Sequence, residues 1–344
     1  DQWFFIEFPI PETTIELEVI VDCPCDANGA VPEIEIVSGG GTYCEGDDAI
    51  LVATNGNSNM SSITYTWFDD NGQIAMETIA PLDTSFVTLT NLQLNDAGHY
   101  TVSAISDLGC EDGPDSLQIT VVSGPEITGV GGGGDYCEGD DVTLTAMNSN
   151  ASIDSISYTW TGPNGFAFSD TVGGSDPLTT TISGVTSDNS GDYTLSVESD
   201  DGCTTANETI TINVNSNPII GNLGGGGDLC EGGSTTLMAM NSATGINSIT
   251  YTWTGPNGFF FQNTVNGDEP LNVLLTNLDA SFSGCYELSV TTDAGCSAPI
   301  DSVCIEVHPN PEISNITGGG DYCVGDAITL SGANLVQGID TIIY

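Results

Sequence analysis

One segment recurs four times at a fixed spacing and sets the organisation of the whole chain. Its second copy reads Gly-Gly-Gly-Gly-Asp-Tyr-Cys-Glu-Gly-Asp over residues 131–140, and its cysteine, Cys137, has counterparts at Cys44, Cys230 and Cys323. The interval between successive cysteines is 93 residues. Repetition at a constant period indicates tandem copies of one structural unit. We therefore expect a linear array of similar modules.

Prolines mark where each module begins, because Pro32, Pro125, Pro218 and Pro311 follow the same interval. Proline is tolerated at the first residue of a strand, and almost no spacer precedes it. We expect stiff joints that hold neighbours end to end. The predicted units are the end of a preceding domain plus a linker over 1–31, complete modules over 32–124, 125–217 and 218–310, and a truncated fourth module over 311–344.

Short runs of alternating apolar residues predict strands within every module. In the second module the runs cover 142–146, 156–160, 178–182, 193–197 and 210–214, with turn residues between them. About seven short strands separated by turns are typical of an antiparallel β-sandwich. The predicted fold class is therefore all-β, with tandem antiparallel sandwiches in a linear array. We expect the tryptophans that recur at the module period to lie in the cores: Trp67, Trp160 and Trp253.

The charge balance excludes several classes of function. The chain has 48 Asp and Glu residues and no Lys or Arg. Binding to nucleic acid requires cations against phosphate, and so does binding to an anionic membrane surface. No apolar run reaches the roughly 18 residues of a membrane span. We expect no nucleic-acid partner and no membrane insertion in this segment, and the carboxylates form either a solvated acidic coat or ligands for divalent cations.

Calcium is the cation that the acidic clusters favour, since Ca²⁺ takes about 6–8 oxygen ligands. The third module has Gly232 and Gly233 where the others have acidic residues, and no EF-hand loop is present, so the acidic coat remains the competing interpretation. A zinc site is disfavoured, because the chain has no Cys-x-x-Cys and only two histidines. The candidate calcium ligands lie in turns of the first two modules: Glu138, Asp140, Asp141, Asp200, Asp201, Glu45, Asp47 and Asp48.

Catalysis has little support in the sequence. His99 lies in a predicted loop and His308 in a predicted linker, and neither histidine recurs in the other modules. Pairs of adjacent carboxylates sit in turns, with no cleft implied. We expect no enzyme, no catalytic residue and no cofactor other than Ca²⁺.

Two sets of motifs give the modules a family resemblance. A tryptophan on the third strand and Asp-x-Gly-x-Tyr at the sixth, present as residues 96–100, resemble an immunoglobulin-type sandwich with a tyrosine corner. The inter-sheet cysteines of that family are absent, since Ala146 and Leu195 hold their positions. The combination of Cys-x-Gly-Asp, Trp-x-Gly-Pro-Asn-Gly-Phe and Asp-x-Gly-Cys resembles the Ig-like or PKD-like repeats of giant surface adhesins of Bacteroidota, including gliding adhesins.

The chain contains 11 cysteines, most of them in repeated positions, which indicates disulfides and an oxidising, extracellular setting. The two cysteines of one module are expected at opposite ends of the sandwich, so pairing within a module requires the glycine run to fold back. The alternative joins successive modules, for example Cys137 to Cys296. We favour pairing within modules, because single modules of the type resembled carry both cysteines. The favoured pairs each span 66 residues: Cys44 with Cys110, Cys137 with Cys203, and Cys230 with Cys296.

The remaining cysteines give separate predictions. Cys285 and Cys304 are equidistant from a hairpin turn and should face each other on adjacent antiparallel strands. Cys23 and Cys25 are too close to bridge each other comfortably, so we expect partners further upstream. Cys323 would need a partner beyond residue 344.

Together these features predict a segment of a long extracellular bacterial surface protein that acts as a structural stalk or filament. The expected partners are copies of the chain itself and an unidentified adhesive target. One alternative is an array of glycan-binding or protein-binding modules, for which the aromatic stretches 259–261 and 166–168 are the only hint, although burial at the sandwich edge is the expected fate of those phenylalanines. Another alternative is an accessory spacer of a secreted multidomain enzyme.

Overall fold

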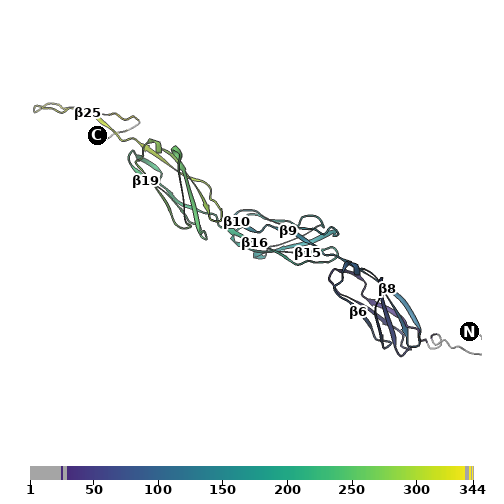
Figure 1. Ribbon diagram of the computed structural model, residues 1–344. Helices are drawn as coiled ribbons and strands as arrows, with labels where there is room; N and C mark the ends of the chain where they lie inside the picture. The colour runs from purple at the N-terminus through teal and green to yellow at the C-terminus, as the bar shows by residue number, and fades with distance from the viewer. Residues whose placement is uncertain (1–24, 26–28, 338–340, 342, 344) are drawn as a thin grey trace, which may run out of the picture.

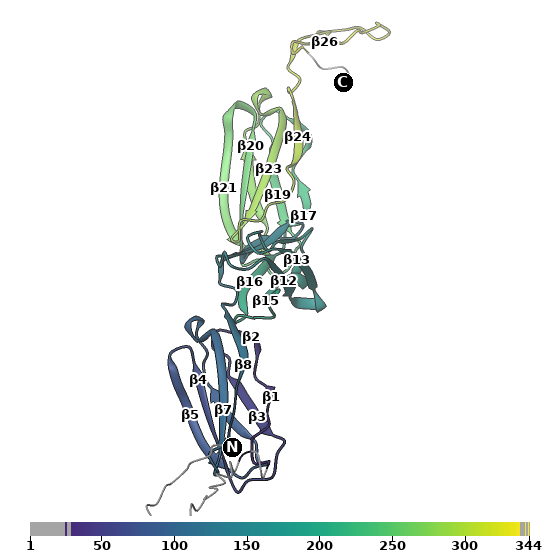
Figure 2. The ribbon, with the colours of Figure 1, turned by 90° about the vertical axis from the view of Figure 1, so that its right-hand side faces the viewer.

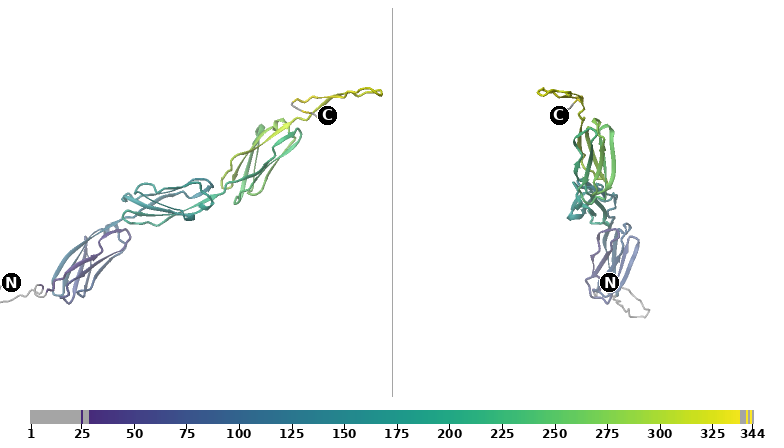
Figure 3. Two further views of the ribbon diagram at one scale, coloured as in Figure 1. Left: turned by 180° about the vertical axis from the view of Figure 1, so that it is seen from behind. Right: turned by 90° about the vertical axis from the view of Figure 1, so that its left-hand side faces the viewer.

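The computed structural model describes residue 25, residues 29–337, and residues 341 and 343. Its three complete modules lie end to end in an extended molecule, with the first module and the final strands at opposite ends (Figures 1 and 2). The view from behind shows the same arrangement (Figure 3). The fold is all-β, with tandem immunoglobulin-like sandwiches in a linear array.

Strands and short 3-10 helices follow one another in a similar order in every module. The first sandwich consists of β1 (Ile34–Ser38), β2 (Gly41–Cys44), β3 (Ala49–Asn55), β4 (Ile63–Asp69), β5 (Gly72–Ile79), β6 (Ser85–Leu89), η1 (Leu94–Asp96), β7 (Gly98–Ser106) and β8 (Glu111–Val122). The second consists of β9 (Ile127–Gly131), β10 (Gly134–Cys137), β11 (Val142–Asn148), β12 (Ser155–Thr161), η2 (Pro163–Gly165), β13 (Ala167–Gly173), β14 (Thr180–Ile182), η3 (Ser187–Asn189), β15 (Gly191–Ser199) and β16 (Glu208–Asn215). The third consists of β17 (Ile220–Gly224), β18 (Gly227–Cys230), β19 (Ser234–Asn241), β20 (Ser248–Gly255), η4 (Pro256–Gly258), β21 (Phe259–Asn266), β22 (Leu271–Thr276), η5 (Ala280–Phe282), β23 (Gly284–Thr292) and β24 (Asp301–His308). Two further strands, β25 (Ile313–Thr317) and β26 (Ser331–Asn334), pair with each other beyond the third sandwich.

Each sandwich combines a three-stranded sheet with a five-stranded sheet. In the second module the sheet orders are β14-β11-β9 and β10-β16-β15-β12-β13. The first module has the corresponding orders β1-β3-β6 and β2-β8-β7-β4-β5, and the third has β17-β19-β22 and β18-β24-β23-β20-β21. The module boundaries at the four prolines remain a prediction.

The first strand of each module changes sheet at the glycine run. In the second module β9 pairs antiparallel with β11, whereas β10 pairs in parallel with β16 and places Cys137 opposite Asn215. The strands β2 and β18 pair in parallel with β8 and β24 in the same way. The glycine run therefore carries the chain along the sandwich to the end where the module finishes.

Glycine is needed at this crossing for a steric reason. Gly132 has φ +102°, and a Cβ atom there would lie 2.5 Å from the carbonyl oxygen of Thr143 on the neighbouring strand. Real Cβ atoms do not approach an oxygen so closely, and a side chain also rarely adopts this backbone conformation. The four-glycine motif is therefore a site of close strand crossing rather than a flexible tether.

The repeated tryptophans occupy the centres of the three cores, as the sequence predicts. Trp67, Trp160 and Trp253 are each 0% exposed. Each belongs to a separate cluster of buried residues, one cluster for each sandwich. Truncation of a buried tryptophan to alanine typically removes about 3–5 kcal/mol of stability. The modules therefore have independent cores of the usual kind.

The tyrosine corner is present in all three modules. The hydroxyl of Tyr100 donates to the carbonyl oxygen of Asp96 at 2.8 Å. Tyr193 donates in the same way to Asn189 at 3.0 Å, and Tyr286 donates to Phe282 at 3.2 Å. This bond fixes the loop before the sixth strand, as the resemblance to immunoglobulin-type sandwiches implies.

Candidate functional site

Disulfides join each sandwich to the next, and these joints are the most distinctive feature of the molecule. Cys44 is bonded to Cys203 and Cys137 is bonded to Cys296, each pair across 159 residues of sequence. The first cysteine of each pair ends the strand that follows the glycine run. The second lies in the turn between the last two strands of the following module.

The favoured pairing within modules was therefore wrong. No bond joins Cys44 to Cys110 or Cys137 to Cys203. The physical reason is the parallel pairing of β10 with β16, which places Cys137 beside Asn215 where the module ends, and so next to the following module. Cys203 lies at the opposite end, in the turn that starts β16. The alternative bond of Cys137 to Cys296 is the one that forms.

The cysteines at the joints are held by backbone hydrogen bonds on both sides. The amide of Cys203 donates to the hydroxyl of Ser199 at 3.1 Å, and Cys203 is 1% exposed. The amide of Cys137 donates to the carboxylate of Asp140 at 2.8 Å. Both sulfur positions are thus fixed before a bond forms, which reduces the conformational entropy lost on cross-linking.

An upstream cysteine completes the series at the first module. Cys25 is bonded to Cys110, across 85 residues. The prediction that Cys25 pairs with sequence further upstream is wrong, because Cys110 is held in the first module in the position that Cys203 and Cys296 hold in the next two. Cys23 lies outside the described residues.

The predicted bond of Cys230 to Cys296 is also wrong, because Cys296 is bonded to Cys137. Among the described residues the free thiols are those of Cys230 and Cys323, and both are exposed. Cys230 ends β18, which is the position that Cys44 and Cys137 hold in the modules before it. The fourth bond, Cys285 to Cys304, lies within the third module across directly paired residues of β23 and β24, as the sequence predicts.

Side-chain amides add polar contacts at the joints. The amide of Asn150 donates to the carbonyl oxygen of Gly124 and to the hydroxyl of Ser123, both at 2.9 Å. At the next joint the amide of Asn217 donates to the carbonyl oxygen of Glu138 at 2.7 Å. These bonds hold the short linkers against the flanking modules, and the sequence patterns did not indicate them.

The candidate calcium ligands lie in turns next to the joints, but several are already engaged. Asp47 and Asp140 accept the amides of Cys44 and Cys137 through their carboxylates, at 2.9 and 2.8 Å. Asp141 accepts the amide of Gly184 at 2.8 Å.

The bond between Cys44 and Cys203 joins the turn of the first module that carries three candidate ligands to the turn of the second that carries two. The first three are Glu45, Asp47 and Asp48, and the other two are Asp200 and Asp201. In the described part of the chain, three metal-ligating atoms within 4.8 Å of one another are found at a different place, at Asp228, Glu306 and His308. Calcium binding by the predicted ligands stays a prediction.

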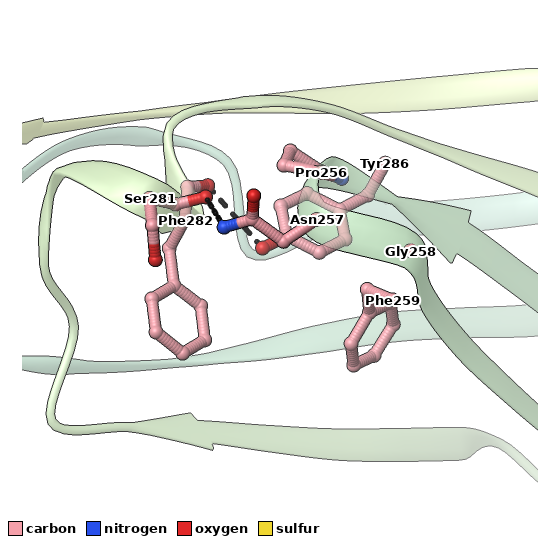
Figure 4. Close-up of a pocket in the computed structure, with 7 residues that line it drawn as sticks. All are labelled: Pro256, Asn257, Gly258, Phe259, Ser281, Phe282 and Tyr286. Carbon is pink, nitrogen blue, oxygen red and sulfur yellow. Dashed lines mark hydrogen bonds between the residues drawn. The ribbon is translucent and has the colours of Figure 1, made fainter.

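A small pocket lies beside the tyrosine corner of the third module (Figure 4). Its volume is about 240 Å³, and its lining includes Phe259, Phe282 and Tyr286. The rings of Phe259 and Tyr286 meet edge to face at 5.2 Å, and the amide of Asn257 donates to the carbonyl oxygen of Ser281 at 2.8 Å. These contacts close the loop onto the core, so the aromatic residues serve packing.

The phenylalanines that hinted at a binding module are divided between core and surface. Phe259 and Phe261 are half-buried and pack against the core of the third module, whereas Phe260 is 64% exposed. In the second module Phe166 and Phe168 also pack against the core. One exposed phenylalanine does not form an aromatic binding platform.

The two histidines occupy different environments. His99 lies in β7 and is exposed, and its backbone amide donates to the carboxylate of Asp70. His308 is the last residue of β24 rather than part of a linker, and its Nε2 lies 3.5 Å from a carboxylate oxygen of Asp228. The described residues contain no helix that is long and apolar enough to cross a membrane.

Comparisons with known proteins give likeness at the level of structure alone. No protein-family model matches the chain, and no curated protein matches its sequence. A variant of titin domains I67–I69 with Glu-to-Ala mutations has 15% identity and a TM-score of 0.55, covering 82% of this chain and 99% of the titin chain. The I-band fragment I67–I69 from titin has 15% identity and a TM-score of 0.53, covering 81% of this chain and 98% of the fragment.

A bacterial ice-binding adhesin of 1.5 MDa gives a solved chain with 15% identity and a TM-score of 0.31, covering 80% of this chain and 98% of that one. The resemblance to adhesins of Bacteroidota stays a prediction. The titin likeness shows the fold: this chain is a tandem array of immunoglobulin-like domains.

Proposed function

We propose that this chain is a tension-bearing segment of an extracellular stalk. The observation that supports this proposal is the overlap of the disulfide loops. Cys44 to Cys203 and Cys137 to Cys296 each span a joint, and residues 137–203 belong to both loops. Neighbouring sandwiches are thus linked covalently by the backbone and by a second, independent bond.

The cross-links shorten the covalent path along the molecule. The backbone path from Cys25 to Cys296 has 271 residues, whereas the path through two disulfides uses only the 27 residues from Cys110 to Cys137. Fully extended, these paths measure about 900 Å and about 90 Å. Unfolding of a sandwich under load would therefore lengthen an oxidised stalk very little.

An extracellular location agrees with these bonds, because structural disulfides persist in oxidising environments. The 48 acidic residues, without Lys or Arg, would keep long chains soluble and apart through like-charge repulsion. Such a role requires no catalytic chemistry. An adhesive target, and copies of the chain as filament partners, remain predictions.

Single-molecule force spectroscopy with handles at both chain ends tests the proposal. We expect the oxidised chain to yield little length, and reduction with a phosphine to add about 800 Å of extensible length. The matched control is the double variant Cys285→Ser with Cys304→Ser, which removes a bond outside the shortest path and should leave the oxidised length unchanged. An oxidised chain that extends as far as the reduced one, or compact particles in electron microscopy, would contradict the proposal.

A further inference from the structure

Three metal-ligating side chains meet at the end of the third sandwich. The strands β18 and β24 pair in parallel, with Asp228 opposite Glu306 and Cys230 opposite His308. Because side chains alternate along a strand, Asp228 and Cys230 share one face of the sheet, and so do Glu306 and His308. One ligand atom from each of Asp228, Glu306 and His308 lies within 4.8 Å of the other two.

The distances suit a small divalent ion. Nε2 of His308 and Oδ1 of Asp228 are 3.5 Å apart, which is at the long end for a hydrogen bond. Two ligands of a tetrahedral Zn²⁺ ion, each bound at about 2.0–2.1 Å, are separated by about 3.4 Å. An ion of this kind fits between the two side chains with little movement of either.

The charge and the donor types also favour such an ion. Two carboxylates face each other in a chain that has no Lys or Arg to neutralise them. An imidazole nitrogen together with carboxylate oxygens suits zinc and similar transition metals, whereas calcium takes oxygen ligands alone. The side chains of His308 and Asp228 are 49% and 79% exposed, so solvent can fill the remaining coordination position.

The repeat supplies an internal comparison for this cluster. In the second module the strands pair in the same register, but Asp135, Asn213 and Asn215 hold the three positions. In the first module the corresponding residues are Thr42, Thr120 and Val122. The backbone geometry is thus common to all three modules, and the complete ligand set occurs in the third. Folding of the repeat does not require these side chains.

We propose that Asp228, Glu306 and His308 bind one zinc-type divalent ion at the end of the third sandwich. The ion would tie β18 to β24 beside Cys230. It would lie at the end that carries the disulfide to the following module in the two preceding sandwiches, and so would stiffen the third module where the next one begins.

Titration of the full chain with ZnCl₂ tests the proposal, with the imidazole signals of the two histidines followed by NMR. We expect a saturable shift of the His308 signals at one ion per chain, while those of His99 stay in place. The variant His308→Asn carries the residue found at this position in the second module, and should bind Zn²⁺ about tenfold more weakly or worse, as measured by calorimetry. Glu306→Asn should act in the same direction.

The matched controls are His99→Asn and Cys230→Ser, which should bind Zn²⁺ as the parent chain does, and excess CaCl₂ should not displace the ion. The proposal would be overturned by equal shifts at both histidines, by unchanged affinity in His308→Asn, or by the absence of a shift. It would also be overturned if Cys230→Ser abolished binding or if Ca²⁺ displaced Zn²⁺.

Discussion

Cys137, at the end of β10 in the second sandwich, is bonded to Cys296 in the turn before β24 of the third. Cys44 and Cys203 stand in the same relationship one module earlier. Each bond thus connects the finishing end of one sandwich to the starting end of the next. The parallel strand after the glycine run makes this possible, because it carries the first cysteine along the length of its own module.

Substitution at the strand crossing should destabilise the second module. Gly132→Ala places a Cβ atom 2.5 Å from the carbonyl oxygen of Thr143 at φ +102°, so we expect a loss of about 2 kcal/mol or more. Gly129→Ala is the matched control: its φ is +62°, but nothing lies within 4 Å of the added atom, and about 1 kcal/mol is expected. Urea unfolding measures both, and equal losses would refute the close-crossing explanation.

Two buried tyrosines should respond differently to removal of the hydroxyl. The hydroxyl of Tyr251 accepts the backbone amide of Asn241 at 2.9 Å, so Tyr251→Phe should lose about 1–2 kcal/mol. The hydroxyl of Tyr65 is buried without a hydrogen-bond partner, so Tyr65→Phe should be neutral or stabilising. Thermal unfolding of both variants checks the prediction, and the reverse order of stability would contradict it.

Alkaline pH should destabilise the modules through their core tyrosines. Burial, followed by the nearby carboxylate of Glu77, raises the pKa of Tyr65 to about 12. Burial also raises the pKa of five further tyrosines: Tyr100, Tyr158, Tyr193, Tyr251 and Tyr286. A raised tyrosine pKa means that the folded state keeps the proton that the unfolded state releases near pH 10.

The stabilisation from these neutral phenols is therefore fully present below about pH 10 and is lost as the pH rises through the folded values. We expect the urea midpoint to fall above about pH 10, with tyrosinate absorbance appearing together with unfolding. The free thiols should be alkylated first, so that disulfide exchange does not contribute. Tyrosinate formation in a chain that stays folded, with an unchanged midpoint at high pH, would refute this prediction.

Much of the fold follows from the sequence, because strand periodicity and the 93-residue repeat are local signals. They locate the core tryptophans, the tyrosine corner and the bond between Cys285 and Cys304, whose partners lie on adjacent strands. The disulfide pairing between modules does not follow. When a cysteine pair recurs at every period, spacings of 66 and 159 residues describe the same set of cysteines, and only the direction of the strand before Cys137 decides between them.

The metal-ligand cluster was missed for a related reason. Asp228 and His308 are 80 residues apart in sequence and meet through the parallel pairing of β18 with β24. Neither residue belongs to a local metal-binding motif. Recognition that the glycine run moves the strand from one sheet to the other would have placed Asp228 beside Glu306 and His308.

Cleavage at a single engineered site tests most directly whether the sandwiches are covalently joined to their neighbours. The chain has no Lys or Arg, so Ser216→Arg would create one tryptic site, in the linker between the second and third sandwiches. After cleavage we expect residues 1–216 and 217–344 to migrate as one species on a denaturing gel without reductant, because Cys137 is bonded to Cys296.

Addition of reductant should then release two fragments. The same cleavage in a chain that also carries Cys137→Ser should release them without reductant, and this variant is the matched control. Two separate fragments from the cleaved, unreduced Ser216→Arg chain would contradict the bridged joints, whereas one band that divides only on reduction is the predicted result.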